Sequence, residues 1–395
     1  MTQSLSETDE AAMLEAVGRW LEREVAPHVA RMEAADEYPA RFVEQLKEMG
    51  LFGATISPDY GGLGLSALTY SRIVARISET WMSLTGLFNT HLLMARAVER
   101  YGTELQKTYW LPRFASGEIR GALGLTEPDA GSDLQGIRTR ARRLADGRYR
   151  IDGSKTWITN GVEGGAVALL VKTDPEADPP RAGMSMFIAP KVDPDTGRPH
   201  EGFKTGRKLN KLGYRGVDTG ELFFDDYVLD AERHLIGGVE GQGFYMAVSG
   251  LELGRVNVAA RGVGIARRAL AEALAYAQTR HTMGRPIAEH QTIQLKLAEM
   301  ATRARAAELL VEDAARAFDR GARADMEAGM AKYFASEAAL ENAIDAMRIH
   351  GGNGYSKEYP LELLFRDAPL LCIGEGTNEI QRLVIARQLV ARNPV

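Results

Sequence analysis

The order in which helical and strand patterns follow one another limits the fold of this chain most strongly. Residues 1–119 carry apolar residues at helical spacing, interrupted by glycines and prolines in ISPDYGGLGLS. Near Gly121 the pattern changes to short runs of β-branched and aromatic residues, and from about Gly241 helical patterns return. We therefore predict an α+β protein with an N-terminal all-α domain (1–119), a central β-sheet domain (120–235) and a C-terminal helical bundle (236–395).

Within this plan, individual elements can be placed. The runs AVALLVKT, MSMFIAP and ELFFDDYVL are predicted strands, and the pairs Asp146-Gly147 and Asp152-Gly153 are favoured in hairpin turns. In the C-terminal part, one predicted helix ends near Gly321, a suitable residue after a helix C-terminus. Spacings of four and three place its apolar residues on one face: Ile293, Leu297, Met300, Ala304, Ala307 and Val311.

Composition excludes several classes of function. The 395 residues have a net charge of −5, which gives no reason to expect nucleic-acid binding. Cys372 is the only cysteine, so neither an intrachain disulfide nor a cysteine-based zinc site is possible. The seven histidines lack an HExxH arrangement, and we predict no metal site. Without a long apolar run or a signal-peptide pattern, we expect no membrane span and a cytoplasmic location.

Two short segments carry residues suited to binding a flat ligand. Glu375 stands between two glycines just before a helix predicted to open at Thr377, whose free N–H groups attract electron-rich partners. In KTWITNG, Trp157 and Thr159 are two residues apart on a predicted strand and share a face. The alternatives are an exposed turn around Glu375 and an ordinary core tryptophan beside a satisfied threonine. No GxGxxG, GxxxxGK[ST] or GxSxG motif is present.

Eight segments occur in a fixed order along nearly the whole chain: YGGLGLS, LGLTEPDAGSD, GSKTWITNG, KLGYRGVDTGELFFDDYVL, LELGRVNVAARGVGIA, RHTMGRPIAEHQ, RIHGGNGYSKEYPLELLFRDA and IGEGTNEIQRLVIAR. In this order they resemble the acyl-CoA dehydrogenases. The resemblance implies an N-terminal all-α domain, a central β-sheet domain and a C-terminal four-helix bundle, the order that the patterns predict independently.

The resemblance also implies FAD, bound without a covalent link between the β domain and the bundle. The residues at family positions that contact it are Leu123, Leu125, Thr126, Ser132, Trp157, Ile158, Thr159, Arg280, Gln291, Arg348, Gly351, Gly352, Thr377, Asn378 and Glu379. Among these, Arg280, Gln291 and the segment from Arg348 to Gly352 would reach the FAD of a neighbouring subunit. The implied assembly is therefore a homo-oligomer, usually a tetramer in this family.

For catalysis, the resemblance makes Glu375 the base that takes the α-proton of an acyl-CoA, while the β-hydrogen leaves as hydride to flavin N5. The product would be a trans-2-enoyl-CoA, with electrons passing on to an electron-transfer flavoprotein. Some relatives place the base just before the arginine of LELGR, but that position is Gly254 here.

The positions that would contact the acyl-CoA are Ser132, Glu252, Arg255 and Gly376. An intrahelical pair between Glu252 and Arg255 is the structural alternative for two of them. A flavin oxidase or monooxygenase of the same fold, and a non-catalytic acyl-CoA-binding flavoprotein, are the competing functions. Straight, branched, dicarboxylic and biosynthetic acyl groups all stay open.

Overall fold

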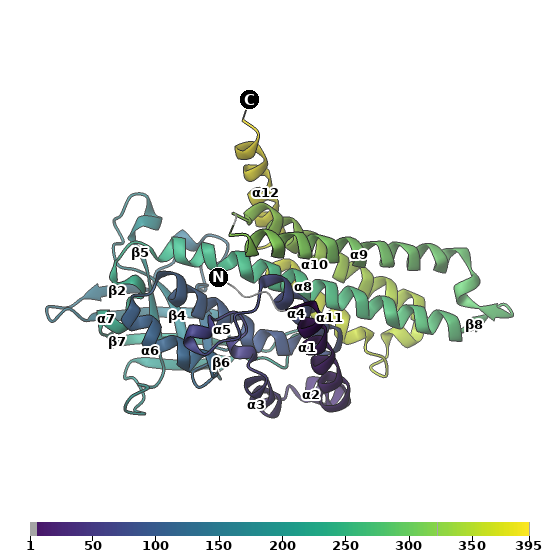
Figure 1. The fold of residues 1–395 in the computed structure, drawn as a ribbon, viewed down its shortest axis with the longest axis horizontal. Helices are drawn as coiled ribbons and strands as arrows, with labels where there is room; N and C mark the ends of the chain where they lie inside the picture. Colours follow the sequence, from purple (N-terminus) through teal and green to yellow (C-terminus); the bar gives the residue numbers. More distant parts are fainter. Residues whose placement is uncertain (1–5, 322, 395) are drawn as a thin grey trace.

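The chain forms a helical N-terminal part, a central sheet and a long helical C-terminal part, which confirms the predicted fold class. This computed structural model describes residues 6–321 and 323–394. Figure 1 shows the sheet at one end of the molecule and the long helices of the C-terminal part extending to the other end. Among the described residues, none of the helices combines the length and apolar character needed to cross a membrane.

The N-terminal part contains α1 (Glu7–Trp20), α2 (Val29–Ala35), α3 (Ala40–Glu48), α4 (Ala67–Trp81), α5 (Ser83–Tyr101) and α6 (Glu104–Ala115). Between α1 and α2 the chain stays helical, but through a π-helical turn at Leu21–Val25 and a 3-10 turn at Ala26–His28. Pro27 lies in this second turn and cannot donate a backbone hydrogen bond. Helices α4 and α5 are buried along most of their length, and α5 contacts the candidate site through Asn89.

The central sheet has seven strands: β1 (Gly121–Gly124), β2 (Arg140–Arg143), β3 (Tyr149–Thr159), β4 (Ala166–Lys172), β5 (Met184–Pro190), β6 (Phe203–Lys208) and β7 (Thr219–Leu229). Their order is β1-β4-β2-β3-β7-β6, and β5 pairs with β4. β1 runs parallel to β4, whereas the β3–β7, β4–β5 and β6–β7 pairs are antiparallel. The three predicted strands are thus confirmed, while β1 and β6 are additional.

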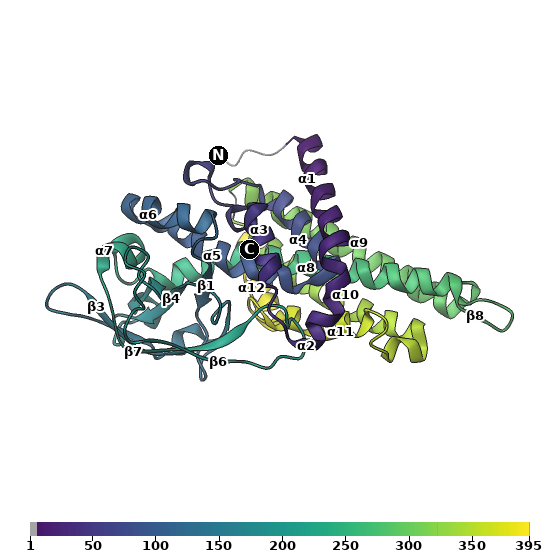
Figure 2. The ribbon, with the colours of Figure 1, turned by 90° about the horizontal axis from the view of Figure 1, so that it is seen from below.

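Both faces of β4 are buried, which explains its continuous apolar run. Ala166, Ala168 and Leu170 face the core shared with the helices, and Val167, Leu169 and Val171 face a second core inside the sheet domain. The alternation follows from the two-residue period of a strand. One face of the sheet therefore packs directly against the helices and shares their core, and Figure 2 shows the sheet beside these helices.

One of the two predicted hairpin turns is correct. Asp146-Gly147 joins β2 to β3, with Gly147 in the left-handed region at φ 87°. Asp152-Gly153, in contrast, lies inside β3, where the pairing with β7 shifts register. A Cβ at Gly153 would lie 2.6 Å from the Thr139 hydroxyl oxygen. This glycine therefore permits a bulge and a close backbone approach instead of a turn.

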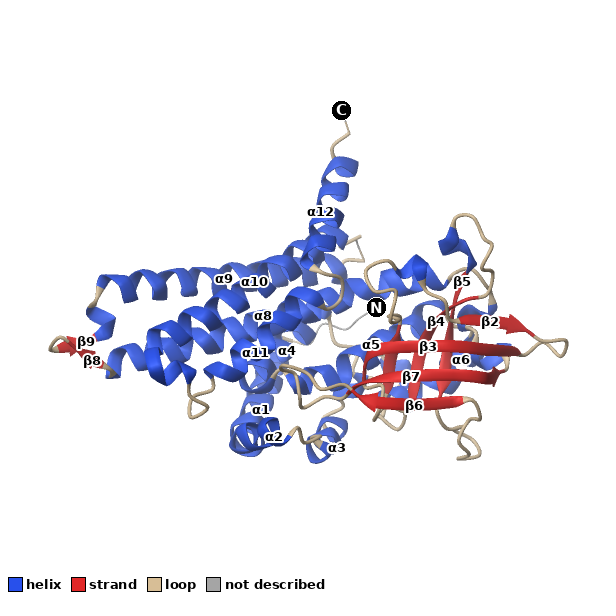
Figure 3. Ribbon diagram, turned by 180° about the vertical axis from the view of Figure 1, so that it is seen from behind, coloured by secondary structure: helices blue, strands red, loops and turns tan. Residues whose placement is uncertain are grey.

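The C-terminal part begins after the short helix α7 (Ala231–His234) and consists of α8 (Gly243–Thr279), α9 (Gln291–Asp319), α10 (Asp325–His350), α11 (Leu361–Ile373) and α12 (Asn378–Arg392). Helices α8 to α11 pack together, and α12 projects from the bundle (Figures 1 and 3). The predicted apolar face of α9 is confirmed at Met300, Ala304, Ala307 and Val311, which are buried. A small hairpin of β8 (His281–Thr282) and β9 (Arg285–Pro286) lies at the far tip.

Candidate active site

Glu375 lies in the short turn that joins α11 to α12. Thr377 is the N-cap residue of α12, and its side-chain oxygen accepts from the Ile380 N–H over 3.4 Å. The backbone of Glu375 is left-handed, at φ 55°. This conformation costs a non-glycine residue about 1–3 kcal/mol and persists only where surrounding contacts hold it. A carboxylate that is carried on a strained backbone at a helix N-terminus is a candidate functional group.

The contacts that hold this turn come from Gln381 on α12. Its side-chain amide donates to the carbonyl of Glu375 over 3.1 Å and to that of Gly376 over 3.0 Å. Gly376 also has a positive φ, of 83°, and a Cβ there would lie 2.8 Å from the same amide nitrogen. The second glycine of the predicted motif is therefore required by both backbone angle and space. Gln381 itself was not a sequence candidate.

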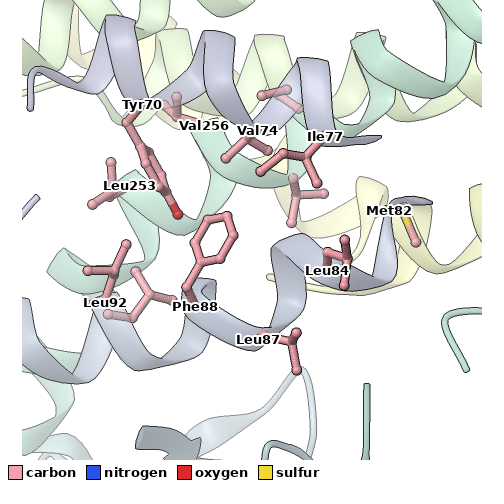
Figure 4. Close-up of a cluster of buried hydrophobic side chains, with 14 of the residues drawn as sticks. Tyr70, Val74, Ile77, Met82, Leu84, Leu87, Phe88, Leu92, Leu253 and Val256 are labelled. Atoms are coloured by element: carbon pink, nitrogen blue, oxygen red, sulfur yellow. The ribbon is translucent and has the colours of Figure 1, made fainter. Parts of the chain in front are cut away.

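The side chain of Glu375 enters the space between α5 and α8. Asn89 on α5 donates a long hydrogen bond of 3.5 Å to its Oε1 atom. On α8, a Cβ at Gly254 would lie 2.9 Å from Oε2. The absence of a side chain at Gly254 thus provides the room that the carboxylate occupies. Figure 4 shows the neighbouring apolar cluster, in which Tyr70 and Leu253 converge.

Burial raises the pKa of Glu375 above its usual range. Three cations oppose this effect: Arg261 most strongly, then Arg255 and Lys332, with the Asn89 hydrogen bond adding to them. Burial outweighs them. A carboxylate with a raised pKa is a better proton acceptor near neutral pH, because its conjugate acid is weaker.

Trp157 and Thr159 lie near the end of β3, where Trp157 is exposed and Thr159 is half-buried. Trp157 is 60% exposed and has φ 60°, whereas Ile158 between them points into the sheet core and is 1% exposed. The alternative of an ordinary core tryptophan is therefore wrong: the strand is irregular at this point, where its pairing with β7 shifts register, and the indole is exposed. An exposed aromatic plane held on a strand is available to cover a flat ligand.

The loop after β1 is fixed to this part of β3 by a buried ion pair. The Lys155 ammonium lies 2.8 Å from the Glu127 carboxylate and also donates to the Leu125 carbonyl over 3.0 Å. The Thr156 N–H donates to the Thr126 carbonyl over 3.0 Å. The candidate cofactor residues of the two segments are thereby brought side by side. No local charge pattern predicts this pair, because its members are 28 residues apart in the chain.

The remaining residues of the loop differ in exposure. Leu125 is buried, Leu123 and Thr126 are half-buried, and Ser132 is exposed. Gly131 faces open space, since a Cβ there would meet only the Thr126 methyl group, at 4.0 Å. The loop therefore presents an open edge at Gly131.

At the start of α12, Thr377 and Glu379 differ from Asn378 in their surroundings. Asn378 is 2% exposed, and its side-chain amide donates to Ser336 and Glu337 while its oxygen accepts from Lys332. These contacts anchor α12 on α10. The side chain of Asn378 is thus committed within the protein, which leaves the backbone of this segment for the predicted cofactor contact.

The other predicted cofactor residues lie far from Glu375. Arg280, Gln291, Arg348, Gly351 and Gly352 are all exposed. They gather at the tip of the bundle beside the β8–β9 hairpin, at the opposite end of the molecule from the sheet (Figure 1). This chain does not bring them to its own candidate site, which is compatible with the implied role across a subunit boundary.

Of the predicted substrate contacts, Glu252 and Arg255 lie near Asp325 on α10. Arg255 Nη1 is 3.9 Å from the Asp325 carboxylate. Burial and the same aspartate raise the pKa of Glu252 to about 7. No ion pair within 4.0 Å joins Glu252 to Arg255 in the part of the chain that the structure describes, so the intrahelical alternative is wrong. Asp325 was missed because only the tertiary fold brings α10 to α8.

Over residues 6–321 and 323–394, no three side chains of histidine, cysteine, aspartate or glutamate lie together in a way that could hold a metal ion.

Family models match the chain in three consecutive segments: the acyl-CoA dehydrogenase N-terminal domain over residues 7–118, the middle domain over 122–227 and the C-terminal domain over 241–390. An acyl-CoA dehydrogenase of Bacillus subtilis is 41% identical over 97% of this chain and 98% of its own length. A (2S)-methylsuccinyl-CoA dehydrogenase of Cereibacter sphaeroides is 40% identical over 94% of this chain and 68% of its own length.

Solved structures agree. Butyryl-CoA dehydrogenase from Megasphaera elsdenii matches with a TM-score of 0.92 and 34% identity, covering 99% of this chain and all of that one. A chain from work on the electron transferring flavoprotein of Acidaminococcus fermentans matches with a TM-score of 0.91 and 35% identity, with 99% and 100% covered. This protein therefore belongs to the acyl-CoA dehydrogenase family and is an oxidoreductase that acts on acyl-CoA thioesters.

Proposed function

We propose that this enzyme desaturates an acyl-CoA between its α and β carbons, with Glu375 as the base that removes the α-proton. One observation carries the proposal: the Glu375 carboxylate is enclosed between α5 and α8, at the start of α12, on a backbone held in a strained conformation. A group held in this way has little freedom to reorient. Its approach to a bound thioester would be fixed before the reaction begins.

Members of this family are FAD flavoproteins. The residues here fit such a group: the indole of Trp157 is exposed, a Cβ at Gly131 would meet only the Thr126 methyl group, and Thr126 is hydrogen-bonded to Thr156, the neighbour of Trp157. We infer that Trp157 and Thr159 cover one side of the flavin ring and that the loop from Leu123 to Ser132 binds its polar edge. When bound, FAD supplies the acceptor for the hydride that leaves the β-carbon.

The protein residues have the remaining tasks. We infer that the backbone N–H of Glu375 donates to the thioester oxygen, on which negative charge grows as the α-proton leaves. One such donor contributes on the order of 3 kcal/mol. The raised pKa of Glu375 suits the proton transfer, and substrate that expels water would strengthen the burial effect. Glu252, Arg255 and Gly376 would position the thioester along α8 and the turn.

We further propose an electron-transfer flavoprotein as electron acceptor and a homo-oligomer, most simply a tetramer. The match to a chain studied with an electron transferring flavoprotein supports the first. The exposed cluster of Arg280, Gln291 and Arg348 at the tip of the bundle supports the second, because it serves no purpose at this chain's own site. The cytoplasmic location stays a prediction from the sequence.

The test is anaerobic titration of the purified FAD-loaded enzyme with a panel of acyl-CoA thioesters, followed by the bleaching of flavin absorbance. Wild type is expected to bleach with at least one thioester. Glu375→Gln should keep FAD yet bleach at least 1,000-fold more slowly, a loss typical of removing a catalytic base. Glu341→Gln, on the exposed side of α10, is the matched control. Near wild-type bleaching by Glu375→Gln would reject the assignment.

The same preparation separates the competing functions. Turnover with a dye or an electron-transfer flavoprotein, but not with oxygen alone, is the expected result. Fast turnover with oxygen alone would indicate an oxidase or monooxygenase. Binding of thioesters without any bleaching would indicate a non-catalytic acyl-CoA-binding flavoprotein.

A further inference from the structure

Arg261 on α8 is a buried cation without a counter-ion in contact. It is 4% exposed, and within residues 6–321 and 323–394 no carboxylate oxygen lies within 4.0 Å of its guanidinium. Nη1 donates to the Tyr214 hydroxyl over 2.9 Å and Nη2 to the Thr85 carbonyl over 3.5 Å, while Nε has no partner. Burying an unpaired charge is costly, so a partner from outside the polypeptide is the natural explanation.

Glu375 is not that partner. No Glu375 oxygen lies within 4.0 Å of the Arg261 guanidinium, and the side chain that donates a hydrogen bond to the carboxylate is Asn89, over 3.5 Å. Arg261 is nonetheless the cation that most opposes the raised pKa of Glu375. The guanidinium therefore lies close enough to influence the base without neutralising it.

Two further buried polar atoms without a partner lie on α8 and on α5, the helices that flank Glu375. On α8, Gly254, Asn257 and Arg261 recur at spacings of three and four and so share one helix face. Asn257 donates to the Tyr70 hydroxyl over 2.7 Å, but its carbonyl oxygen has no partner. The carbonyl oxygen of Asn89 on α5 also has none. The unpartnered Arg261 Nε–H needs an acceptor, which a carboxylate supplies and a saturated hydrocarbon chain does not, whereas the two amide oxygens would need a donor.

Close packing between Tyr214 and α5 holds the hydroxyl group that contacts Arg261 in place. Tyr214, at φ 56°, packs its hydroxyl against Gly86 on α5, where a Cβ would lie only 1.7 Å from that oxygen. Because the Tyr214 oxygen accepts from Arg261, its own O–H is left to donate. Together the guanidinium and the phenol offer donors to one anion, such as a carboxylate.

The separation between this cation and the base sets the length of a ligand that touches both. Glu375 reaches Asn89, and Arg261 reaches Thr85, which lies one turn earlier on α5. Four residues of helix correspond to a rise of about 6 Å. A thioester with its α-carbon at Glu375 would span this distance with two or three further carbons, the last one a carboxylate.

We propose that Arg261, with the Tyr214 hydroxyl, binds a terminal carboxylate of the substrate, which is then the CoA monothioester of a dicarboxylic acid of about four or five carbons. This inference rests on the proposed function, since it names the acyl group for the same site. One similar protein reported above is named for such a substrate, (2S)-methylsuccinyl-CoA. The reaction is unchanged: an α-proton goes to Glu375, a β-hydride to FAD, and the carboxylate is retained.

The experiment compares glutaryl-CoA and succinyl-CoA with pentanoyl-CoA and butanoyl-CoA, their uncharged counterparts, by anaerobic flavin bleaching of the FAD-loaded enzyme. We expect kcat/KM to favour the charged member of at least one pair by about 10- to 100-fold, the effect of charge-assisted hydrogen bonds. Arg261→Gln should bring this ratio towards one, mainly through a higher KM for the charged thioester. Arg261→Lys, which lacks the forked geometry, should give an intermediate ratio.

Arg267→Gln is the control, because Arg267 also lies on α8 but pairs with Glu79 and Glu308 away from the site. It should leave the ratio unchanged. Equal or better turnover of the uncharged thioesters by wild type would overturn the inference, even if Arg261→Gln failed to fold. If no thioester bleached the flavin, the proposed function itself would fail.

Discussion

The side-chain amide of Asn89 donates to Oε1 of Glu375 over 3.5 Å, joining a helix of the N-terminal domain to the turn before α12. The two residues are 286 positions apart, so neither domain alone assembles this part of the site. The interaction favours the charged carboxylate and lowers its pKa, against the larger effect of burial.

Asn89→Leu should therefore raise the pKa of Glu375 further. The acidic limb of kcat/KM, on which the base becomes deprotonated, is expected to move to higher pH. At pH 6 the loss should be about 2- to 10-fold, the value of one hydrogen bond, and it should shrink as pH rises. The measurement is a pH profile of dye-linked turnover. Asn89→Asp, which adds a negative charge, should move the limb further, and an unmoved limb in both variants would contradict this role.

Gly254→Ala should displace the catalytic carboxylate. The new methyl group would lie 2.9 Å from Glu375 Oε2 and 3.1 Å from Leu93 Cδ1, so the base must shift. A shift of about 1 Å at the reacting group is expected to lower kcat by about 100-fold. Gly250→Ala on the same helix meets nothing within 4 Å and is the control. Equal kcat values for the two variants would show that Gly254 is not needed for space.

Lys155→Met should destabilise the domain that carries the loop from Leu123 to Ser132. It leaves the buried Glu127 carboxylate without its cation, a change that costs about 3–5 kcal/mol. We expect a lower midpoint in urea unfolding and weaker retention of FAD. In Lys155→Met/Glu127→Gln both charges are gone, so part of the stability should return. A double variant no more stable than the single one would argue against the ion pair as the cause.

Asp367 makes stability depend on pH. It is 2% exposed, and burial, together with the neighbouring Glu33, raises its pKa to about 8. The unfolded value is about 3.9, so the folded protein holds a proton that the unfolded chain releases between about pH 4 and pH 8. Its contribution to stability is complete below this window and is lost as pH rises through it, by up to about 1.4 kcal/mol per pH unit.

The test is urea unfolding of Asp367→Asn between pH 5 and 8.5. Asparagine keeps an acceptor for the Tyr214 N–H, now 2.6 Å from the carboxylate, but cannot titrate. The variant should therefore lose this component of the pH slope and gain stability relative to wild type at pH 8. Asp313→Asn, at an exposed position on α9, should keep the wild-type slope.

Local patterns predicted the elements whose burial is regular. The two-residue alternation of β4 and the apolar face of α9 are visible in sequence because each element meets its core along its whole length. The hairpin turn predicted at Asp152-Gly153 was wrong, because the same pair of residues suits both a turn and a bulge, and only the pairing with β7 decides between them. The sequence also left open whether Trp157 is a core residue, because a bulge changes which side of a strand a residue faces. The boundaries at 119/120 and 235/236 stay predictions.

In the candidate site, too, some residues could be predicted from local sequence and others only from the fold. Glu375 was predictable because its two glycines and the helix start are adjacent in sequence. Gln381, Asp325 and Arg261 were not, since their importance depends on which helix faces them. In the sequence, a buried arginine cannot be distinguished from an arginine on a helix surface. Only the fold shows that Arg261 is buried without a carboxylate in contact.

The contact between α5 and the turn before α12 also has a consequence for biosynthesis. A ribosome adding about 5–20 residues per second needs roughly 15–60 s to travel from Asn89 to Glu375. The nascent chain can fold its first helices and most of its sheet in that time while still lacking its proton acceptor. Chains whose synthesis stops just before this turn would thus be well packed over much of their length but would have no proton acceptor and no activity.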